Sequence, residues 1–294
     1  MKGTEFVSAF ASKGYAAWEA AAFDAASSGG VVDWPWVDVA LSDGENSAIV
    51  RVQSDVFSIG TLGDPDFLRL PLTPSRAQQI ANLQGLLLPT PLLAYRTWQQ
   101  AEVKLQPIAM VPNKGTNLAQ FAEHQAAIEA QRQGRQGLIA GIKKSVVVSN
   151  IMVAGKVVIF GWYRPAPDIF DNKLKMGDPA RQPLQPLSNV HAAMYWDYSH
   201  GIQFYHPVCS VNGAPMNLID VMQHPVLWRL VSHEGPLKAA RYQAPNQPAQ
   251  PRPVDSFVDN AAYTVTPTQN SYADLGLGRV AEDSRLASLA KKGQ

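Results

Sequence analysis

Two short runs of large apolar residues, many of them β-branched, constrain the fold of this chain more than any other feature. They are residues 146–149 (VVVS) and 157–162 (VVIFGW). Nearly unbroken runs of this kind are typical of strands buried on both faces of a sheet. Ala154 and Gly155 lie between the runs and predict a turn. The sequence therefore predicts a pair of central strands in this region.

Helical patterns precede these strands. Residues 4–27 carry apolar side chains at helical spacing, and residues 118–134 repeat the pattern. Thr73 and Thr90 are each followed by proline, which predicts two more helix starts. A threonine hydroxyl can accept from an N–H of the first turn, and proline has no N–H to leave unpaired. We expect the second of these helices to run to about Leu105.

Further elements follow from alternation and turn residues. The expected strands are residues 33–39, 47–52, 194–198 and 202–205, and Asn212 with Gly213 predicts a hairpin turn. Residues 218–231 predict a helix that is interrupted before Pro225.

These elements predict an α+β fold in which a helical N-terminal portion packs on a mainly antiparallel sheet, with an extended C-terminal arm. The expected divisions are a mostly helical portion with a small hairpin at 1–140, a strand-rich region at 141–242, and an arm rich in proline and glutamine at 243–294.

Composition narrows the function classes. The 294 residues include 25 Lys and Arg against 24 Asp and Glu, so no strong field attracts a nucleic acid or an acidic membrane. Charged residues make up 17%, below the usual value of about 25%, and 46% of residues are hydrophobic, which favours a folded chain. The single Cys209 forms no intrachain disulfide, so a reducing compartment is compatible. Compartment itself is left open.

Neither a membrane span nor a signal peptide is expected. No apolar run reaches the roughly 18 residues that a spanning helix requires. Near the N-terminus, polar side chains interrupt any apolar stretch of a signal peptide: Glu5, Ser8, Ser12 and Lys13.

The candidate site lies in the histidine-rich region, since five of the six histidines fall between 191 and 233. Strand alternation would place Asp197 and Ser199 on one face and Tyr198 and His200 on the other. A turn or bulge at 199–201 would instead bring His200 to Asp197. We then expect His200 to act as acid or base, Asp197 or His191 to orient it, and Ser199 or Tyr198 to be a hydrogen-bonding or nucleophilic partner.

Two alternatives remain open for the same residues. The aromatic and histidine side chains can simply pack as a half-buried surface with satisfied polar tips. A metal site could use His191, Asp197, His200 and His206, but these lack the spacing of known metal motifs, so no metal is assigned and the cofactor stays unknown. Cys209 lies in an apolar run, which is typical of a small buried hydrophobic residue.

Substrate contacts are expected from a second group of residues. Lys143 and Lys144 follow a glycine-rich stretch and offer ammonium groups to a carboxylate or phosphate, although a solvated strand end is an alternative. Trp162 can offer a stacking face, although aromatic residues in strands more often belong to the core. The proline-rich residues 165–186 predict a long surface loop beside a cleft.

Several stretches resemble a family of bacterial proteins with no established activity. They are FLRLPLTPSRAQQIANLQGLLLPT, AEVKL, KKSVVVSN, GKVVIFGWYRP, VHAAMYWDYSHGIQF and VNGAPMNLIDVMQHPVLWRLVSHEG, together most of residues 45–235. The resemblance implies histidine and aspartate at the positions of Ile142 and Ser145, and histidine at the position of Tyr163. This chain departs from the family at those three positions.

A shorter segment is similar to YkuD-type L,D-transpeptidases, which are cell-wall enzymes with a cysteine nucleophile. The similarity covers His191 and the Ser199, His200, Gly201 triplet, and Ile202 stands where the cysteine would be. This resemblance implies at most a cell-wall type of substrate.

We therefore expect a hydrolase that acts on a cell-wall-type or other polymeric substrate through histidine and aspartate acid-base chemistry. The alternative is a non-catalytic assembly protein, such as a phage virion component or a binding module, with a protein partner or self-association through the C-terminal arm.

Overall fold

The computed structural model describes residues 1–110, 117–163 and 183–243 and confirms the α+β class. The predicted arm at 243–294 and most of the predicted loop at 165–186 lie outside the described residues. Within them the helices are α1 (Gly3–Phe10), α2 (Tyr15–Ser28), α3 (Pro74–Leu83), α4 (Pro91–Gln100), α5 (Leu118–Arg132), α6 (Leu218–Gln223) and the 3-10 helix η2 (Leu227–Leu230).

One four-stranded sheet joins distant parts of the chain in the order β1-β2-β11-β12, with every neighbouring pair antiparallel. Its strands are β1 (Trp36–Ser42), β2 (Ser47–Gln53), β11 (Val208–Val211) and β12 (Ala214–Asn217). Both hairpins were predicted. The turn between β11 and β12 has Asn212 at φ 50° and Gly213 at φ 86°, which is the backbone conformation that Asn-Gly turns favour.

The second four-stranded sheet has the order β10-β7-β8-β9. Its strands are β7 (Lys144–Val146), β8 (Ile159–Gly161), β9 (Gln185–Ser188) and β10 (His200–Gly201). β7 and β8 form the predicted antiparallel pair, while β10 joins β7 in parallel. Two small pairs complete the described strands: β3 (Ser58–Ile59) with β4 (Leu68–Arg69), and β5 (Val103–Lys104) with β6 (Ile139–Ala140).

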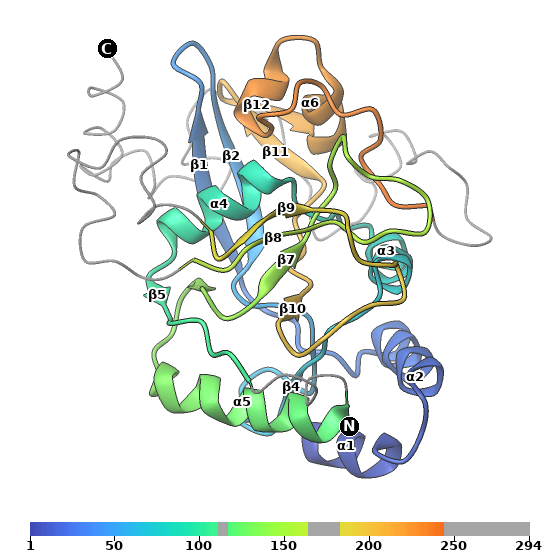
Figure 1. Cartoon of the computed structure of the whole chain (residues 1–294). Coiled ribbons are helices and arrows are strands. Elements are labelled where there is room, and N and C mark those ends of the chain that lie inside the picture. The colour runs from blue at the N-terminus through green and yellow to red at the C-terminus, as the bar shows by residue number, and fades with distance from the viewer. Residues whose placement is uncertain (111–116, 164–182, 244–294) are drawn as a thin grey trace.

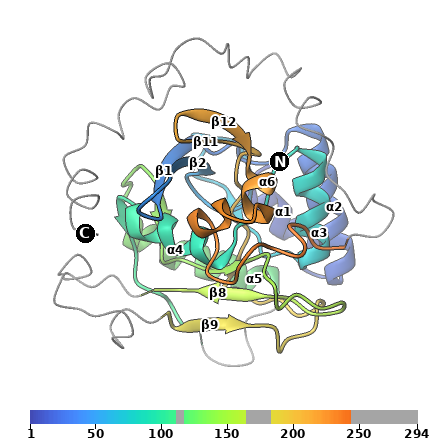
Figure 2. The ribbon, with the colours of Figure 1, turned by 90° about the horizontal axis from the view of Figure 1, so that it is seen from above.

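The helices fill the space around and between these sheets. α4 contacts both β1 and β8, and Figure 2 shows it between the two four-stranded sheets. α5 packs on β4 and α1 at the opposite end of the molecule from α6 (Figure 1). The largest cluster of buried apolar side chains runs from Phe6 to Ala240, so both halves of the sequence contribute to one core.

Four element predictions were wrong in detail. Residues 202–205 form no strand, and Tyr205 alone makes isolated bridges, to Val52 and Leu87. The helix expected over 4–27 is two helices, since α1 ends at Phe10 and α2 starts after Gly14. The helix after Thr90 ends at Gln100 and is followed by β5. Residues 194–198 form no strand, because the Asp197 carboxylate accepts from the backbone N–H of Ser199 and closes a turn.

Across the three described ranges, no helix has both the length and the apolar character needed to cross a bilayer.

Candidate functional site

Of the two arrangements that the sequence left open, the bend between Asp197 and His200 is the one present. The His200 N–H donates to the Asp197 carbonyl at 3.0 Å, and the Ser199 N–H donates to the Asp197 carboxylate at 2.8 Å. The Ser199 hydroxyl also donates to this carboxylate and is buried, so it serves the turn. Burial acts to raise the pKa of Asp197, but His200 and the Ser199 hydrogen bonds outweigh it and lower the pKa overall.

The imidazole of His200 does not reach solvent, although the sequence predicted an accessible acid or base. The side chain is 1% exposed, and neither ring nitrogen has a hydrogen-bond partner among the described residues. Burial lowers the pKa of His200 to about 4, so the ring is neutral at physiological pH. The Asp197 carboxylate therefore does not orient His200 through a hydrogen bond.

His191 lies near this pair through an aromatic stack. Its ring is 4.2 Å from that of Tyr195, and the edge of Tyr195 meets His200 at 5.7 Å. The Tyr195 hydroxyl donates to the Asp197 carboxylate at 3.0 Å. The structure thus brings His191, Asp197 and His200 into one neighbourhood, with the tyrosine between the two imidazoles.

The two predicted lysines diverge. Lys144 is the first residue of β7 and pairs with His200, and its ammonium lies 5.2 Å from the centre of the Trp162 ring. Strand alternation places Lys143 and Ser145 on the other face. The sequence had suggested that both lysine side chains bind one negative group. In the structure they point to different places, so they do not converge on one group.

The Lys143 amine is buried in a polar contact with α5. Its Nζ lies 3.0 Å from Nδ1 of His124 and also donates to the carbonyl of Tyr198. His124 Nε2 lies 3.2 Å from the carbonyl of Ile108, which assigns its proton to Nε2 and leaves Nδ1 as an acceptor. The Tyr198 ring meets the His124 ring edge-on at 4.8 Å. It therefore packs against the His124 and Lys143 pair and does not face outward.

Burial sets the protonation of both groups. It lowers the pKa of Lys143 to about 7, with Arg69 contributing in the same direction and Asp197 and Asp55 opposing it. Burial, together with Lys143, lowers the pKa of His124 to about 3. A neutral Lys143 amine has two N–H groups, which the His124 and Tyr198 acceptors satisfy, and one lone pair that remains available to take a proton.

Lys143 lines a small, partly open cavity. Ser145 and Gly201 line it from β7 and β10, Trp98 from α4, and Trp162 and Tyr163 from the segment after β8. The space available to the centres of water-sized atoms is about 30 Å³. Gly201 is required at this wall because a Cβ there would lie 2.5 Å from the Lys143 Cβ.

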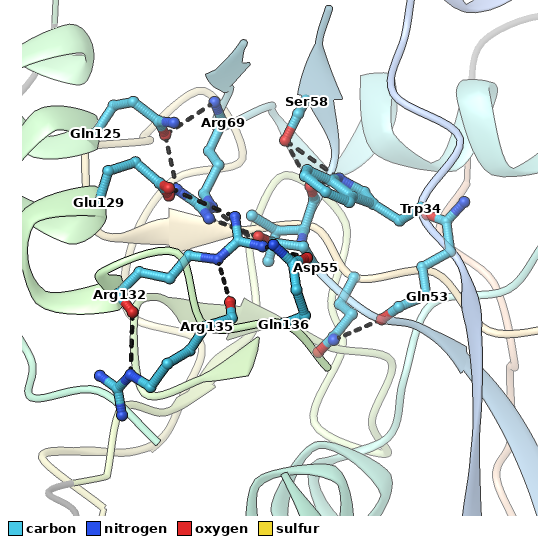
Figure 3. Close-up of polar contacts among 12 residues, drawn as sticks. Trp34, Gln53, Asp55, Ser58, Arg69, Gln125, Glu129, Arg132, Arg135 and Gln136 are labelled. Atoms are coloured by element: carbon cyan, nitrogen blue, oxygen red, sulfur yellow. Dashed lines mark hydrogen bonds and ion pairs between the residues drawn. The ribbon is translucent and has the colours of Figure 1, made fainter. Parts of the chain in front are cut away.

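A buried ion-pair network is centred on Arg69, close to the residues that line this cavity. Figure 3 shows the network. Arg69 donates to both carboxylate oxygens of Asp55, at 2.9 and 2.5 Å, and both side chains are fully buried. From α5, Gln125 and Glu129 accept from the same guanidinium at 3.0 and 2.7 Å. Val56, the residue after Asp55, contributes to the cavity wall. The network therefore anchors α5, and with it His124, against the cavity.

The other candidates lie elsewhere. Cys209 is buried in β11, and burial raises the pKa of its thiol to about 12, so it is no nucleophile. His206 packs edge-on against Trp36 of β1, away from the His200 turn. No group of three or more His, Cys, Asp or Glu in the described part of the chain is arranged to hold a metal ion.

Sequence reasoning missed His124, the one histidine outside the 191–233 region. A signal was present: Phe121, Gln125 and Ile128 mark the buried stripe of α5, and His124 lies within it. A histidine in an apolar stripe requires a polar partner.

Comparison with protein-family models, curated proteins and solved structures finds no match for this chain. The two sequence resemblances therefore stay predictions. Ile142, Ser145 and Tyr163, where the predicted resemblance implied other residues, all line the cavity beside Lys143.

Proposed function

We propose that the protein is a hydrolase in which Lys143, held by His124, is the general base and Ser145 is the nucleophile. The observation that carries this proposal is the Lys143 amine, which lines a cavity while His124 and Tyr198 occupy both N–H groups of its neutral form. Polymeric cell-wall material remains the predicted substrate class, and the chemistry requires only an ester or amide carbonyl.

The base is suited to neutral pH. With a pKa of about 7, Lys143 is substantially unprotonated under physiological conditions, whereas an exposed lysine is charged. His124 stays neutral and accepts a hydrogen bond from the amine, so it positions Lys143 without competing for the proton.

Ser145 is the nucleophile that this base can serve. It lies two positions after Lys143, which directly precedes β7, so alternation favours one face for both side chains, and both residues line the same cavity. Its hydroxyl makes no hydrogen bond to any described residue, unlike that of Ser199, which is bound to Asp197. Serine–lysine pairs are an established variant of the serine–histidine arrangement.

The reaction proceeds in two steps. The Ser145 Oγ attacks the substrate carbonyl carbon, its proton passes to the Lys143 Nζ, and the leaving group departs with that proton. Water then attacks the acyl-serine ester, again giving a proton to Lys143, and releases the carboxylic acid with the free hydroxyl of Ser145.

The second candidate function is a non-catalytic assembly protein. It is favoured by the burial of His200 and by the engagement of Ser199 and Asp197 in a turn, because these residues need no substrate to explain them.

The test is hydrolysis of p-nitrophenyl esters and of purified peptidoglycan by the full chain. We expect kcat to rise with pH through about 7 and to fall at least about 100-fold in Lys143→Met and in Ser145→Ala, because general-base catalysis contributes 10²–10⁴-fold. Lys143→Arg keeps a positive charge but cannot act as a base, so it should be as inactive as Lys143→Met.

Lys238→Met is the matched control, since Lys238 is exposed and is not among the residues that line the cavity. It should retain parental turnover. Thermal unfolding of each variant separates loss of chemistry from loss of fold. No turnover by the folded parent protein, or full turnover by folded Ser145→Ala, would favour the assembly function.

A further inference from the structure

Two tryptophans that line the cavity have buried indole N–H groups without a hydrogen-bond partner among the described residues. Nε1 of Trp98 and Nε1 of Trp162 make no hydrogen bond to any described residue, and the side chains are 4% and 9% exposed. Both tryptophans line the cavity beside Lys143. Unpaired buried donors are rare in folded proteins, so two at one cavity require an explanation.

The backbone of Trp162 adds an independent observation. Its φ is 66°, the left-handed region that large aromatic residues avoid, and Gly161 before it has φ 101°. Such conformations persist where the surrounding structure imposes them, often at ligand sites. The turn sets Trp162 next to Tyr163, whose ring stacks on Trp98 at 4.5 Å. The two indoles are thereby held on the same cavity.

The charge of the residues that line the cavity favours a ligand that accepts hydrogen bonds. Among the described residues that line the cavity, Lys143 is the basic one and carries a positive charge when it is protonated, and none is an aspartate or glutamate. The free space of about 30 Å³ for atom centres suits about two oxygen-sized atoms. Two donors, one cation and room for two oxygens match a carboxylate group.

We propose that this cavity binds the carboxylate group of a small organic acid, with the N–H groups of Trp98 and Trp162 donating to its oxygens and the protonated form of Lys143 supplying charge. Binding needs no turnover, so this proposal goes beyond the hydrolase function and is tested separately from it.

Acetate and formate are the probes, titrated at constant ionic strength against the full chain labelled with ¹⁵N at the tryptophan indoles. We expect saturable shifts of the Trp98 and Trp162 indole resonances, assigned through the Trp98→Phe and Trp162→Phe variants. The Trp34 resonance should stay in place, because its N–H already donates to the Val56 carbonyl at 2.9 Å. Chloride at equal concentration should not reproduce the shifts.

The variants give the second arm. Phenylalanine keeps an aromatic ring and removes the N–H, so each variant should weaken acetate binding by about 10-fold or more. Trp228→Phe, outside the cavity lining, should bind as the parent does. Absence of saturable shifts in the parent would overturn the proposal, since the two indole N–H groups would then have no carboxylate partner. Equal shifts with the neutral analogue acetamide would overturn the carboxylate assignment.

Discussion

Lys143 shows how one residue can depend on a neighbour that has no side chain. Its methylene stem crosses Gly201 of β10, and the nearest atoms to a Cβ added there are the Lys143 Cβ at 2.5 Å, its Cγ at 3.0 Å and the Val56 Cγ1 at 3.1 Å. A glycine at this position leaves open the space that a Cβ would fill in any other residue. In the structure this space holds the lysine stem, because only a glycine lets the stem pass to His124.

Gly201→Ala is therefore expected to destabilise the protein by about 1–3 kcal/mol, the usual cost of overpacking, and to displace the Lys143 amine. Denaturant unfolding measures the first effect, and the pH dependence of any turnover measures the second. Gly14→Ala is the comparison, since a Cβ at this helix start has no heavy atom within 4 Å. Its cost should stay below about 1 kcal/mol. Equal stability of Gly201→Ala and the parent would contradict the packing argument.

For the residues at 197–200 the sequence offered a bend as one of two arrangements and did not give the direction of the His200 imidazole. In the structure the Asp197 carboxylate closes the turn by accepting from the Ser199 N–H, a role that was not predicted from the sequence. Whether His200 then points to solvent depends on Tyr195, five residues earlier, and on Lys144 of the distant strand β7. Local patterns carry no information about such contacts.

Helix α4 illustrates the element scale, because its first turn was predictable and its packing was not. Thr90 caps the helix through its hydroxyl, which accepts from the Leu93 N–H at 3.1 Å, as the Thr-Pro pattern predicted. The same hydroxyl donates to the carbonyl of Val231, 141 residues later. The helix then delivers Trp98 to the cavity. Its cap therefore also fixes one wall of the candidate site.

Replacing Thr90 by alanine should cost about 1–3 kcal/mol of unfolding free energy, because the buried Leu93 N–H and Val231 carbonyl both lose their partner. Thr90→Ser keeps the hydroxyl and should recover most of that loss. Chemical denaturation of the two variants beside the parent gives the comparison. If serine and alanine were equally destabilising, the hydroxyl would not be the stabilising group.

The segment 194–198 was predicted as a strand and is not one, because its aromatic side chains pack against a helix. The segment 194–198 has the aromatic content of a strand, yet Trp196 packs on Tyr15 and Trp18 of α2, at 4.7 and 5.7 Å. Trp196 is therefore buried against helix α2 and not against a neighbouring strand. Strand propensity describes a half-buried surface in general, so it does not identify which element provides the burial.

The whole molecule is organised by contacts that link distant segments. The β1–β2 hairpin was predicted, but its pairing with β11 joins residues about 160 positions apart, such as Ile49 and Ser210. The fully buried Arg69 likewise links Asp55 to α5. The sequence predicted the α+β class from local periodicity. It could not predict these pairings, because periodicity shows which face is buried and not against what.

Buried neutral histidines make the stability of the molecule depend on pH. Burial lowers the folded-state pKa of His124 to about 3 and of His200 to about 4, whereas both titrate near 6.5 when unfolded. Between these values the unfolded chain binds more protons than the folded one. Their contribution is therefore fully present above about pH 6.5 and is lost as pH falls toward 4, by up to about 1.4 kcal/mol per pH unit for each histidine.

His200→Leu isolates one of these contributions, because leucine fills the buried site and does not titrate. The groups facing His200 are Asp197, Lys144, His191 and Lys143, and all remain in the variant. Glu19, whose pKa burial raises, opposes the trend equally in both proteins, so it cancels in the difference. We expect the free energy of unfolding of the variant, relative to that of the parent, to rise steadily as pH falls from about 6.5 to 4.5. Parallel stability curves for the two proteins over that range would mean that His200 is protonated in the folded state, and its burial would then have to be relieved by a partner or by solvent.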